Sequence, residues 1–284
     1  MTLVYCSIPD SKVNPLFEVF DGGDLILSSY RGIEAKLADV QIYFPDRERI
    51  ADAKNALAAA LEIVGVEADI LVREVADEDW KYAYRRHFTT ERASPRIIVH
   101  PEWEPKPEVN GGEIVITIDP GLAFGTGKHE TTKACLQYID EVAPRGGSFR
   151  DMGCGSGILS IAAQKLGFAP VAGFDVDEEA VAAARENARF NGEEIEFFRY
   201  GLGAKVRKDL GRADVVAANI LGPLLVKFAD EITAAAKRDL IISGILAEIY
   251  DDVLAAFTKR GFKEVSRKTI GEWTTGLLIR NDAK

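Results

Sequence analysis

The fold of this chain is decided by one glycine-rich stretch, Asp151-Met152-Gly153-Cys154-Gly155-Ser156-Gly157. Apolar residues at helical spacing follow it over residues 158–166, and Gly167 is a good helix terminator. Residues 171–175 then have the composition of a strand, which ends in the acidic Asp175. The sequence therefore predicts a strand, a glycine turn, a helix and a second strand, in that order.

The glycine turn predicts a binding site for a nucleoside cofactor. Gly153, Gly155 and Gly157 have no side chains, so a ligand can approach the free N–H groups at the start of the helix. Asp175 stands at the tip of the next strand, where a carboxylate accepts hydrogen bonds from a ribose diol. A glycine turn alone is a weak signal, but acids on both sides of it, Asp151 and Asp175, favour the cofactor interpretation.

The glycine spacing distinguishes between cofactors. Dinucleotide sites have the pattern G-x-G-x-x-G, whose third glycine lets the helix pack closely beneath a pyrophosphate. This chain has G-x-G-x-G, and position 158 is Ile, so the dinucleotide pattern fails. The form D-x-G-x-G-x-G resembles motif I of class I S-adenosylmethionine-dependent methyltransferases.

Length and composition allow one large domain, or one large and one small domain, in 284 residues. No apolar run approaches the roughly 18 residues that span a bilayer, and the N-terminus lacks a signal-peptide pattern. The three cysteines, at positions 6, 135 and 154, are odd in number and unclustered. They predict reduced thiols in a cytoplasmic protein, with no zinc site. The three histidines are too scattered to indicate a metal site, and we expect no membrane association.

The charge of the chain bears on its partners. The net charge is −10, whereas a protein that binds duplex nucleic acid usually has a basic face, so we expect no direct nucleic-acid binding. Residues 1–75 contain 13 acidic and 7 basic residues, a net charge of −6. Two interpretations stay open for this segment: a solvated acidic surface, or a docking module for a lysine-rich protein, which complementary charge would attract.

Two domains and a linker are predicted. Residues 1–75 should form a small α+β domain, in an order compatible with a ferredoxin-like sandwich whose first helix is degraded. Its strands are expected at residues 3–8, 24–29, 37–44 and 66–75, and its helix at 49–64. Residues 76–95 should be a linker that contains a helix over 77–88.

Residues 96–284 are predicted to form the larger domain. Strands at 96–99 and 113–118 lead into a region where strands and helices alternate, and two strands, 262–269 and 273–280, close the chain as an antiparallel pair. Later helices are expected at 178–191, 224–236 and 245–260, and strands at 194–200, 213–218 and 240–243. This alternation predicts a doubly wound α/β sheet with its ligand at the carboxyl ends of the strands.

The loop at 119–132 is unusually rich in Gly and Thr for a segment between two regular elements. Phe124 offers a π face for a sulfonium cation. His129 has two open interpretations, a general base or a residue that caps or lines the loop, and the second is favoured for a lone histidine. Thr132 is expected to open a helix that runs to about residue 142.

Four segments resemble a known family, in the right order along the chain. They are D-E-D-W at 77–80, G-L-A-F-G-T-G-K-H-E-T-T at 121–132, D-M-G-C-G-S-G-I-L-S-I-A-A at 151–163 and A-N-I-L-G-P-L at 218–224. The chain resembles the bacterial lysine methyltransferases that modify large-subunit ribosomal protein L-eleven (L11). The resemblance covers about residues 77–280; over residues 1–75 it depends on position and element order alone.

The resemblance implies a seven-stranded class I methyltransferase (Rossmann-like) domain behind a small substrate-recognition domain. It implies an enzyme that transfers methyl groups from S-adenosyl-L-methionine to lysine ε-amines of L11, and it leaves open whether the α-amine is also a target. The cofactor contacts that it implies are Thr132, Gly153, Asp175 and Asn219, joined by Gly155 and Gly157 in the same turn and by Phe124 and Gly125.

Asn219 indicates the kind of amine. It ends a strand next to the expected position of the methyl group, where its carbonyl oxygen can accept a hydrogen bond from the incoming amine. The sequence Asn219-Ile220-Leu221-Gly222 has no aromatic residue to stack on a planar target, which favours an aliphatic amine. No dedicated catalytic base is expected.

Three alternatives remain open at this point. The first is a lysine methyltransferase of another protein, such as the electron-transfer flavoprotein β-subunit. The second is a nucleotide-dependent oxidoreductase, against which Ile158 argues. The third is a cofactor-binding module without catalysis.

Overall fold

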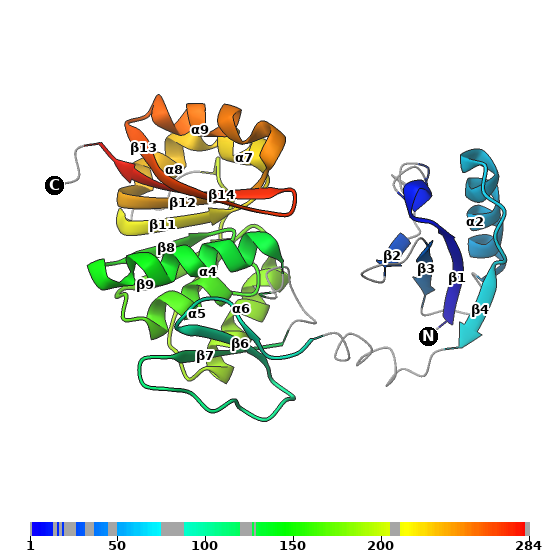
Figure 1. Ribbon diagram of the computed structural model, residues 1–284, viewed down its shortest axis with the longest axis horizontal. Helices are drawn as coiled ribbons and strands as arrows, with labels where there is room; N and C mark the ends of the chain where they lie inside the picture. Colours follow the sequence, from blue (N-terminus) through cyan, green and yellow to red (C-terminus); the bar gives the residue numbers. More distant parts are fainter. Residues whose placement is uncertain are drawn as a thin grey trace. The chain divides into compact units, whose positions relative to one another are not determined.

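The computed structural model describes residues 2–13, 16, 19, 27–31, 37–44, 50–74, 88–119, 127, 129–204 and 211–281. The chain divides into two compact units, Met1–His87 and Phe88–Lys284, which are called unit 1 and unit 2 (Figure 1). Residues 77–87 of the expected linker helix lie outside the described residues.

Unit 1 is a four-stranded antiparallel sheet with one long helix. Its elements are β1 (Thr2–Pro9), β2 (Leu27–Arg31), β3 (Leu37–Phe44), α2 (Ile50–Val64) and β4 (Leu71–Glu74). The strand order is β2-β3-β1-β4, and each neighbouring pair is antiparallel. This arrangement confirms the predicted small α+β domain with a ferredoxin-like strand order, but residues 66–70 of the expected strand 66–75 are not in a strand.

The core of unit 1 follows from two periodicities. Alternate residues of β1 face inward (Val4, Cys6 and Ile8), and they pack against a helical stripe on α2 that includes Leu57 and Leu61. Unit 1 therefore has a hydrophobic core of its own.

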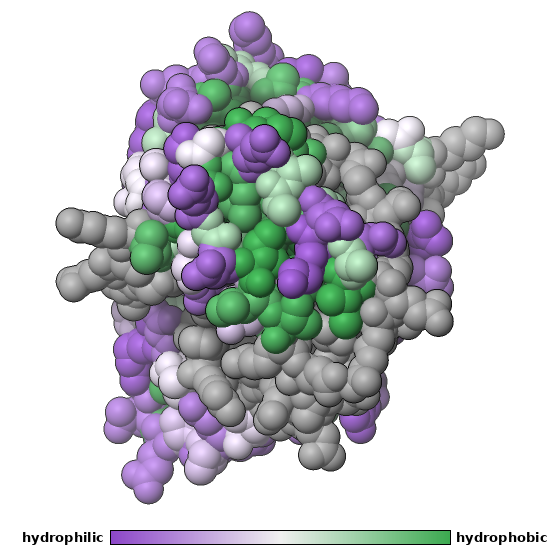
Figure 2. Space-filling view, turned by 90° about the vertical axis from the view of Figure 1, so that its right-hand side faces the viewer, coloured by the Kyte–Doolittle hydropathy of each residue, from purple (hydrophilic) through white to green (hydrophobic). Residues whose placement is uncertain are grey.

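Apolar side chains also reach the surface of unit 1. Ile63 is 70%, Leu71 50% and Val72 41% exposed. Figure 2 shows a band of apolar side chains that is bordered by hydrophilic ones. The described surface of unit 1 therefore carries apolar as well as charged side chains.

Unit 2 contains a seven-stranded sheet in the order β10-β9-β8-β11-β12-β14-β13 and a smaller sheet in the order β5-β6-β7. β10, β9, β8, β11 and β12 are parallel, and β14 runs antiparallel to both of its neighbours. Its elements are β5 (Glu91–Arg92), β6 (Ile97–Pro101), β7 (Ile114–Ile118), α4 (Glu130–Val142), β8 (Phe149–Met152), α5 (Ile158–Lys165), β9 (Val171–Asp175), α6 (Glu178–Phe190), β10 (Glu196–Arg199), β11 (Ala213–Asn219), α7 (Gly222–Lys227), α8 (Ala229–Ala235), β12 (Ala236–Leu246), α9 (Tyr250–Thr258), β13 (Phe262–Ile270) and β14 (Trp273–Arg280). The predicted seven-stranded doubly wound fold is confirmed.

Two cores cover the two faces of this sheet. On β11, Val215 and Ala217 pack into the core that α4, α5 and α6 share, whereas Val216 and Ala218 pack into the core that α7, α8 and α9 share. Figure 1 shows α4 and the α7–α9 group on opposite sides of the sheet. Because both faces are buried, β11 is an almost continuous apolar run, and ligands can reach the sheet only at its ends.

Two predicted helices differ from the structure. The expected helix at 224–236 is interrupted at Phe228, which separates α7 from α8. The expected helix at 245–260 begins later, because β12 continues to Leu246, where it pairs with Trp273 of β14. Among the described residues, no helix combines the length and apolar character that crossing a membrane requires.

Candidate cofactor-binding site

The turn between β8 and α5 can be built only from glycine at its key positions. Gly153 and Gly157 have φ angles of 75° and 78°. A Cβ atom on Gly153 would lie 2.6 Å from Ile220 Cγ2, and one on Gly157 would lie 2.9 Å from the Cβ of Ala184. The turn is therefore packed between α6 and the residue that follows β11, with no room for side chains at these glycines. It lies at the carboxyl edge of the sheet, because it directly follows β8.

Asp175 ties this turn to the end of β9. Its Oδ2 accepts a hydrogen bond from the N–H of Gly155 at 3.0 Å, and its Oδ1 accepts from the N–H of Asp177 at 3.1 Å. The N–H groups of Gly153 and Cys154 both donate to the carbonyl of Phe174 at 2.9 Å. The acid predicted to bind a ribose thus lies directly beside the glycine turn.

Asp151 anchors α5 from beneath the turn. Its Oδ2 accepts from the N–H of Ser160 at 3.2 Å and from the hydroxyl of Ser160 at 2.8 Å. The carboxyl is fully buried, and Oδ1 has no hydrogen-bond partner in the described part of the chain. Burial raises the pKa of Asp151 to about 7, although the bonds from Ser160 act in the opposite direction. This acid therefore stays protonated to a higher pH than an exposed aspartate does.

The start of α4 supplies a second side of the site. His129 is the N-cap residue of α4, and its Nδ1 accepts from the N–H of Thr131 at 3.4 Å, so the favoured interpretation of His129 as a cap is confirmed. Thr132 is fully buried, and no described residue hydrogen-bonds its hydroxyl oxygen. An unsatisfied buried hydroxyl is costly unless a ligand pairs with it. Thr132 therefore has a hydrogen-bonding capacity that no described residue uses.

Asn219 completes the group at the carboxyl edge. It is the last residue of β11, and its register partner on β12 is Ser243. On the other side of β11, Ala218 is in register with Met152, the last residue of β8. The next residue of each segment, Asn219 and Gly153, therefore lies at the same end of these two neighbouring strands. The structure thus brings Gly153, Asp175 and Asn219 together at the ends of β8, β9 and β11. Phe124 and Gly125 lie outside the described residues.

Trp273 was not singled out from the sequence, yet it lies at the same edge. It begins β14, and its ring packs edge-on against His129, with the ring centroids 5.3 Å apart. The sequence predicted a strand over residues 273–280. Nothing in that pattern indicated that the first residue of this antiparallel strand would lie beside the start of α4.

These residues fit a nucleoside cofactor with an amino-acid tail. They offer a bare glycine backbone, a carboxylate in the ribose position of β9, and a buried hydroxyl without a partner. The described residues contain no group of three or more His, Cys, Asp or Glu side chains placed to hold a metal ion.

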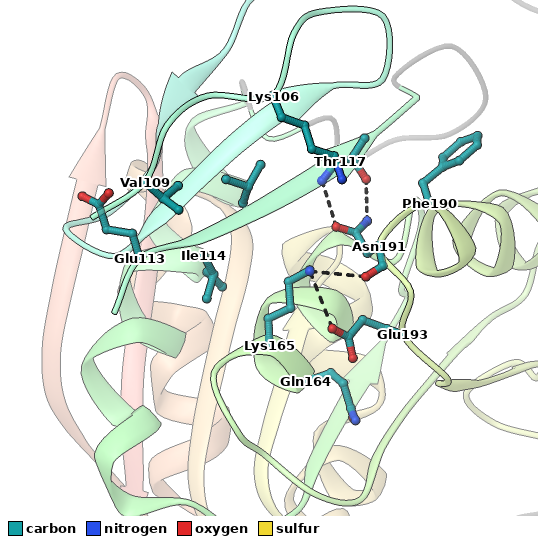
Figure 3. Close-up of a pocket in the computed structure, with 11 residues that line it drawn as sticks. Lys106, Val109, Glu113, Ile114, Thr117, Gln164, Lys165, Phe190, Asn191 and Glu193 are labelled. Atoms are coloured by element: carbon teal, nitrogen blue, oxygen red, sulfur yellow. Dashed lines mark hydrogen bonds and ion pairs between the residues drawn. The ribbon is translucent and has the colours of Figure 1, made fainter. Parts of the chain in front are cut away.

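A separate pocket of about 510 Å³ opens at the far end of α5 (Figure 3). β7, the loop before β7 and the ends of α5 and α6 line it, and Lys165 there lies 3.6 Å from Glu193. The eight residues of α5 span about 12 Å between this pocket and the glycine turn. It is therefore distinct from the candidate cofactor site.

The chain is similar to proteins of one known family. Residues 18–280 match the family model described as ribosomal protein L11 methyltransferase (PrmA). The protein named ribosomal protein L11 methyltransferase in Caldanaerobacter subterraneus subsp. tengcongensis is 37% identical over 261 residues, which cover 91% of this chain and 81% of that protein. The one in Geobacter sulfurreducens is 42% identical over 211 residues, covering 73% of this chain and 68% of that protein.

A solved structure agrees with these relatives. The crystal structure of ribosomal protein L11 methylase from Lactobacillus delbrueckii subsp. bulgaricus superposes with a TM-score of 0.63 at 31% identity. The match covers 68% of this chain and 99% of that one. With the glycine turn, Asp175 and Asn219 at the carboxyl edge of a seven-stranded sheet, these matches establish that the chain belongs to the ribosomal protein L11 methyltransferase family.

Proposed function

We propose that this enzyme transfers methyl groups from S-adenosyl-L-methionine to lysine ε-amines of large-subunit ribosomal protein L11. One observation supports this most directly: the glycine turn, Asp175 and Asn219 lie together at the ends of three adjacent strands, in a chain of this family. The alternative of another protein substrate has no relative in its favour among those described above.

The cofactor would be held by residues from four segments. Asp175 would bind the ribose hydroxyls, and Gly153, Gly155 and Gly157 would let the cofactor approach the backbone of the turn. Thr132 would pair its free hydroxyl with the cofactor, and Asn219 would border the methyl group. Phe124 and Gly125 are proposed as further contacts. When bound, S-adenosylmethionine supplies an activated methyl group on its sulfonium.

The chain's own task is to present a neutral amine in line with that methyl group. A free lysine has a pKa of about 10.4, and burial next to a positive charge lowers it. The carbonyl oxygen of Asn219 would accept one N–H of the amine and so direct its lone pair, which supplies the proximity and orientation part of the rate enhancement. No dedicated base is needed in this scheme.

Residues 1–75 would recognise the substrate, residues 76–95 would link the units and residues 96–284 would carry out methyl transfer. The net charge of −6 over residues 1–75 complements a lysine-rich protein. Cys6, Cys135 and Cys154 are free and buried, which suits a reaction in the cytoplasm.

An intact-mass assay tests the proposal. The enzyme is incubated with S-adenosylmethionine and unmodified recombinant ribosomal protein L11, and we expect the substrate mass to rise in steps of one methylene group, at lysines that peptide mapping then identifies. A reaction without cofactor is the control. If calorimetry shows cofactor binding but no mass step appears, the substrate assignment is wrong; if the cofactor does not bind, the cofactor assignment is wrong.

A further inference from the structure

Asn187 of α6 joins two backbone segments that border the candidate cofactor site. Its Nδ2 donates to the carbonyl oxygen of Ser156 at 2.9 Å, and its Oδ1 accepts from the N–H of Asp119 at 2.9 Å. Ser156 lies inside the glycine turn, and Asp119 directly follows β7. Asn187 is 2% exposed; its bond to Ser156 is buried, and its bond to Asp119 is partly buried.

The partners fix the orientation of this amide. A backbone carbonyl can only accept a hydrogen bond and a backbone N–H can only donate one, so the amide has one productive orientation. The residues around it on the buried face of α6, Ala183, Ala184 and Ala188, are small and apolar. Alanine is the better helix former, so the helix itself gives no reason for a buried asparagine here.

Asn191, one helical turn later, provides an internal comparison. Its Oδ1 accepts from the N–H of Thr117 at 2.9 Å, and its Nδ2 donates to the carbonyl of Thr117 at 2.6 Å (Figure 3). The same Nδ2 also donates to the backbone carbonyl of Asn187 at 2.7 Å. Asn191 therefore pairs with the outer edge of β7 as a neighbouring strand would. Among the described residues, Asn191 has no hydrogen bond to the glycine turn, whereas Asn187 bonds both the turn and the residue that follows β7.

The hydrogen bond to Ser156 complements those that hold the rest of the turn. Gly155 is fixed through its N–H by Asp175, and the N–H of Gly157 donates to the carbonyl of Cys154 at 2.8 Å. Asn187 holds the carbonyl of the residue between these two glycines. The direction of the peptide groups that a cofactor would meet thus depends on a side chain from α6.

We infer that Asn187 is a positioning residue for the cofactor, which holds the glycine turn at a fixed distance from the backbone that leaves β7. This inference rests on the proposed function, because it assumes that the turn binds S-adenosylmethionine. Asn187 need not touch the cofactor; it acts through Ser156 and Asp119.

The test compares two isosteric variants, Asn187→Asp and Asn191→Asp, in the full chain. Each replaces an Nδ2 donor by a carboxylate oxygen. At Asn191, the C-cap residue of α6, the lost bonds are those to the carbonyls of Thr117 and Asn187, so only the change at Asn187 removes a bond to the turn. For N187D at pH 8 we expect the Kd of S-adenosylmethionine, measured by calorimetry, to rise about tenfold or more, because a buried carbonyl loses its donor. For N191D we expect a change of less than about twofold, although this variant also loses the hydrogen bonds of an Nδ2 donor.

The pH dependence of affinity separates positioning from folding. Burial raises the pKa of the introduced carboxyl, and once protonated it can again donate to the carbonyl of Ser156. At about pH 5.5 the affinity of N187D should therefore return to within about threefold of the wild type at the same pH. In turnover, the KM for the cofactor should rise while the KM for the protein substrate stays unchanged.

Three results would overturn the inference. They are equal losses of affinity in both variants, an unchanged Kd in folded N187D, or a loss that low pH does not reverse. Cofactor binding by the wild type is measured first, so that failure of the proposed function is recognised separately. If N187D does not fold, amide hydrogen exchange is measured on the wild type instead. We expect bound cofactor to slow exchange at the amide of Asp119 together with the amides of the turn. Fast exchange at Asp119 with and without cofactor would contradict the inference.

Discussion

At the scale of single residues, the buried carboxyl of Asp151 links the glycine turn to pH. Burial raises its pKa to about 7, whereas an aspartate in an unfolded chain has a pKa near 4. Between these values the native protein holds more protons than the unfolded chain. The stability contributed by this group is therefore full below about pH 4 and is lost as the pH rises towards 7.

Asp151→Asn should remove this dependence. The amide oxygen can still accept from Ser160, but it does not ionise. Between pH 5 and pH 8 we expect the free energy of unfolding of the wild type to fall by about 2–3 kcal/mol relative to that of the variant. Urea unfolding at several pH values measures this difference, and parallel curves for the two proteins would show that Asp151 keeps an ordinary pKa.

The hydroxyl of Thr132 gives a second prediction at this scale. It is buried with no partner among the described residues, so its removal in Thr132→Val should leave stability unchanged or raise it by about 1 kcal/mol. The affinity for S-adenosylmethionine should fall by about tenfold, since the proposed hydrogen bond is lost. Thr131→Val is the contrasting variant: its hydroxyl bonds His129 at 2.8 Å, so its loss should lower the melting temperature. A T132V protein that is destabilised as much as T131V would argue that the hydroxyl serves the fold.

At the scale of elements, local pattern predicted most of the fold. β3 and β9 match their predicted bounds residue for residue, because alternating or continuous apolar runs ended by turn residues are local signals. The length of β12 was missed, since its last residues pair with β14, about 30 residues later in the chain. The helical pattern that follows Ile245 concealed this non-local pairing.

The sequence also predicted part of the candidate site. The positions of Asp175 and Asn219 at the carboxyl edge were predicted because each ends a strand. The turn was predicted because its glycines are close in sequence. Asn187 was missed because its two partners lie 31 and 68 residues away, and the contacts that give it a role exist only in the folded chain. A buried asparagine in an alanine-rich helix is the signal that could have indicated it.

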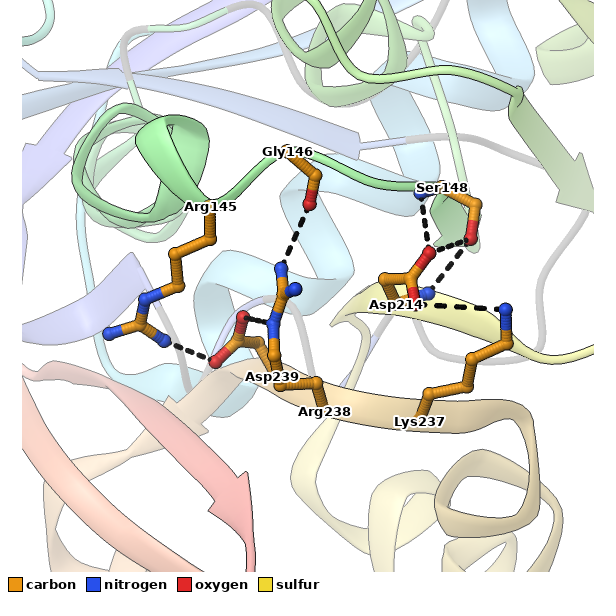
Figure 4. Close-up of polar contacts among 7 residues, drawn as sticks. All are labelled: Arg145, Gly146, Ser148, Asp214, Lys237, Arg238 and Asp239. Atoms are coloured by element: carbon orange, nitrogen blue, oxygen red, sulfur yellow. Dashed lines mark hydrogen bonds and ion pairs between the residues drawn. The ribbon is translucent and has the colours of Figure 1, made fainter. Parts of the chain in front are cut away.

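The opposite, amino-terminal end of the large sheet is held by ion pairs (Figure 4). Asp239 of β12 is fully buried and bonds Arg145 at 2.5 Å and Arg238 at 2.8 Å. Asp214 of β11 accepts from the N–H and the hydroxyl of Ser148. These contacts tie the starts of β11 and β12 to the segment that leads into β8.

Removing the arginines should lower the stability more than neutralising Asp239 does. In the double variant R145A/R238A the buried carboxylate of Asp239 loses both partners, and we expect a cost of about 3–5 kcal/mol in unfolding free energy. In Asp239→Asn the two arginines lose a charged partner. Their side chains are 44% and 30% exposed in the wild type and can be hydrated, so the unfolding free energy should fall by only about 1–2 kcal/mol. Urea unfolding measures both. Equal costs would mean that water reaches Asp239 once the arginines are removed.

At the scale of the whole molecule, we propose that cofactor binding and substrate docking belong to different units. Unit 1 has its own core around Val4, Leu57 and Leu61, and unit 2 has a core on each face of its large sheet. Every described residue of the candidate site comes after Phe88. The cofactor site should therefore survive the removal of unit 1.

A fragment of residues 88–284 tests this division of labour. We expect it to bind S-adenosylmethionine within about threefold of the full chain, because no described contact of the site is lost. Methylation of whole ribosomal protein L11 should fall by about a hundredfold or more, since a docking unit raises the effective concentration of a tethered substrate by factors of this order. The loss should appear in the KM for the protein substrate and disappear with a short lysine peptide, which cannot use the docking unit. Full activity of the fragment on whole L11 would assign recognition to unit 2, and loss of cofactor binding would show that unit 1 supports the fold of the site.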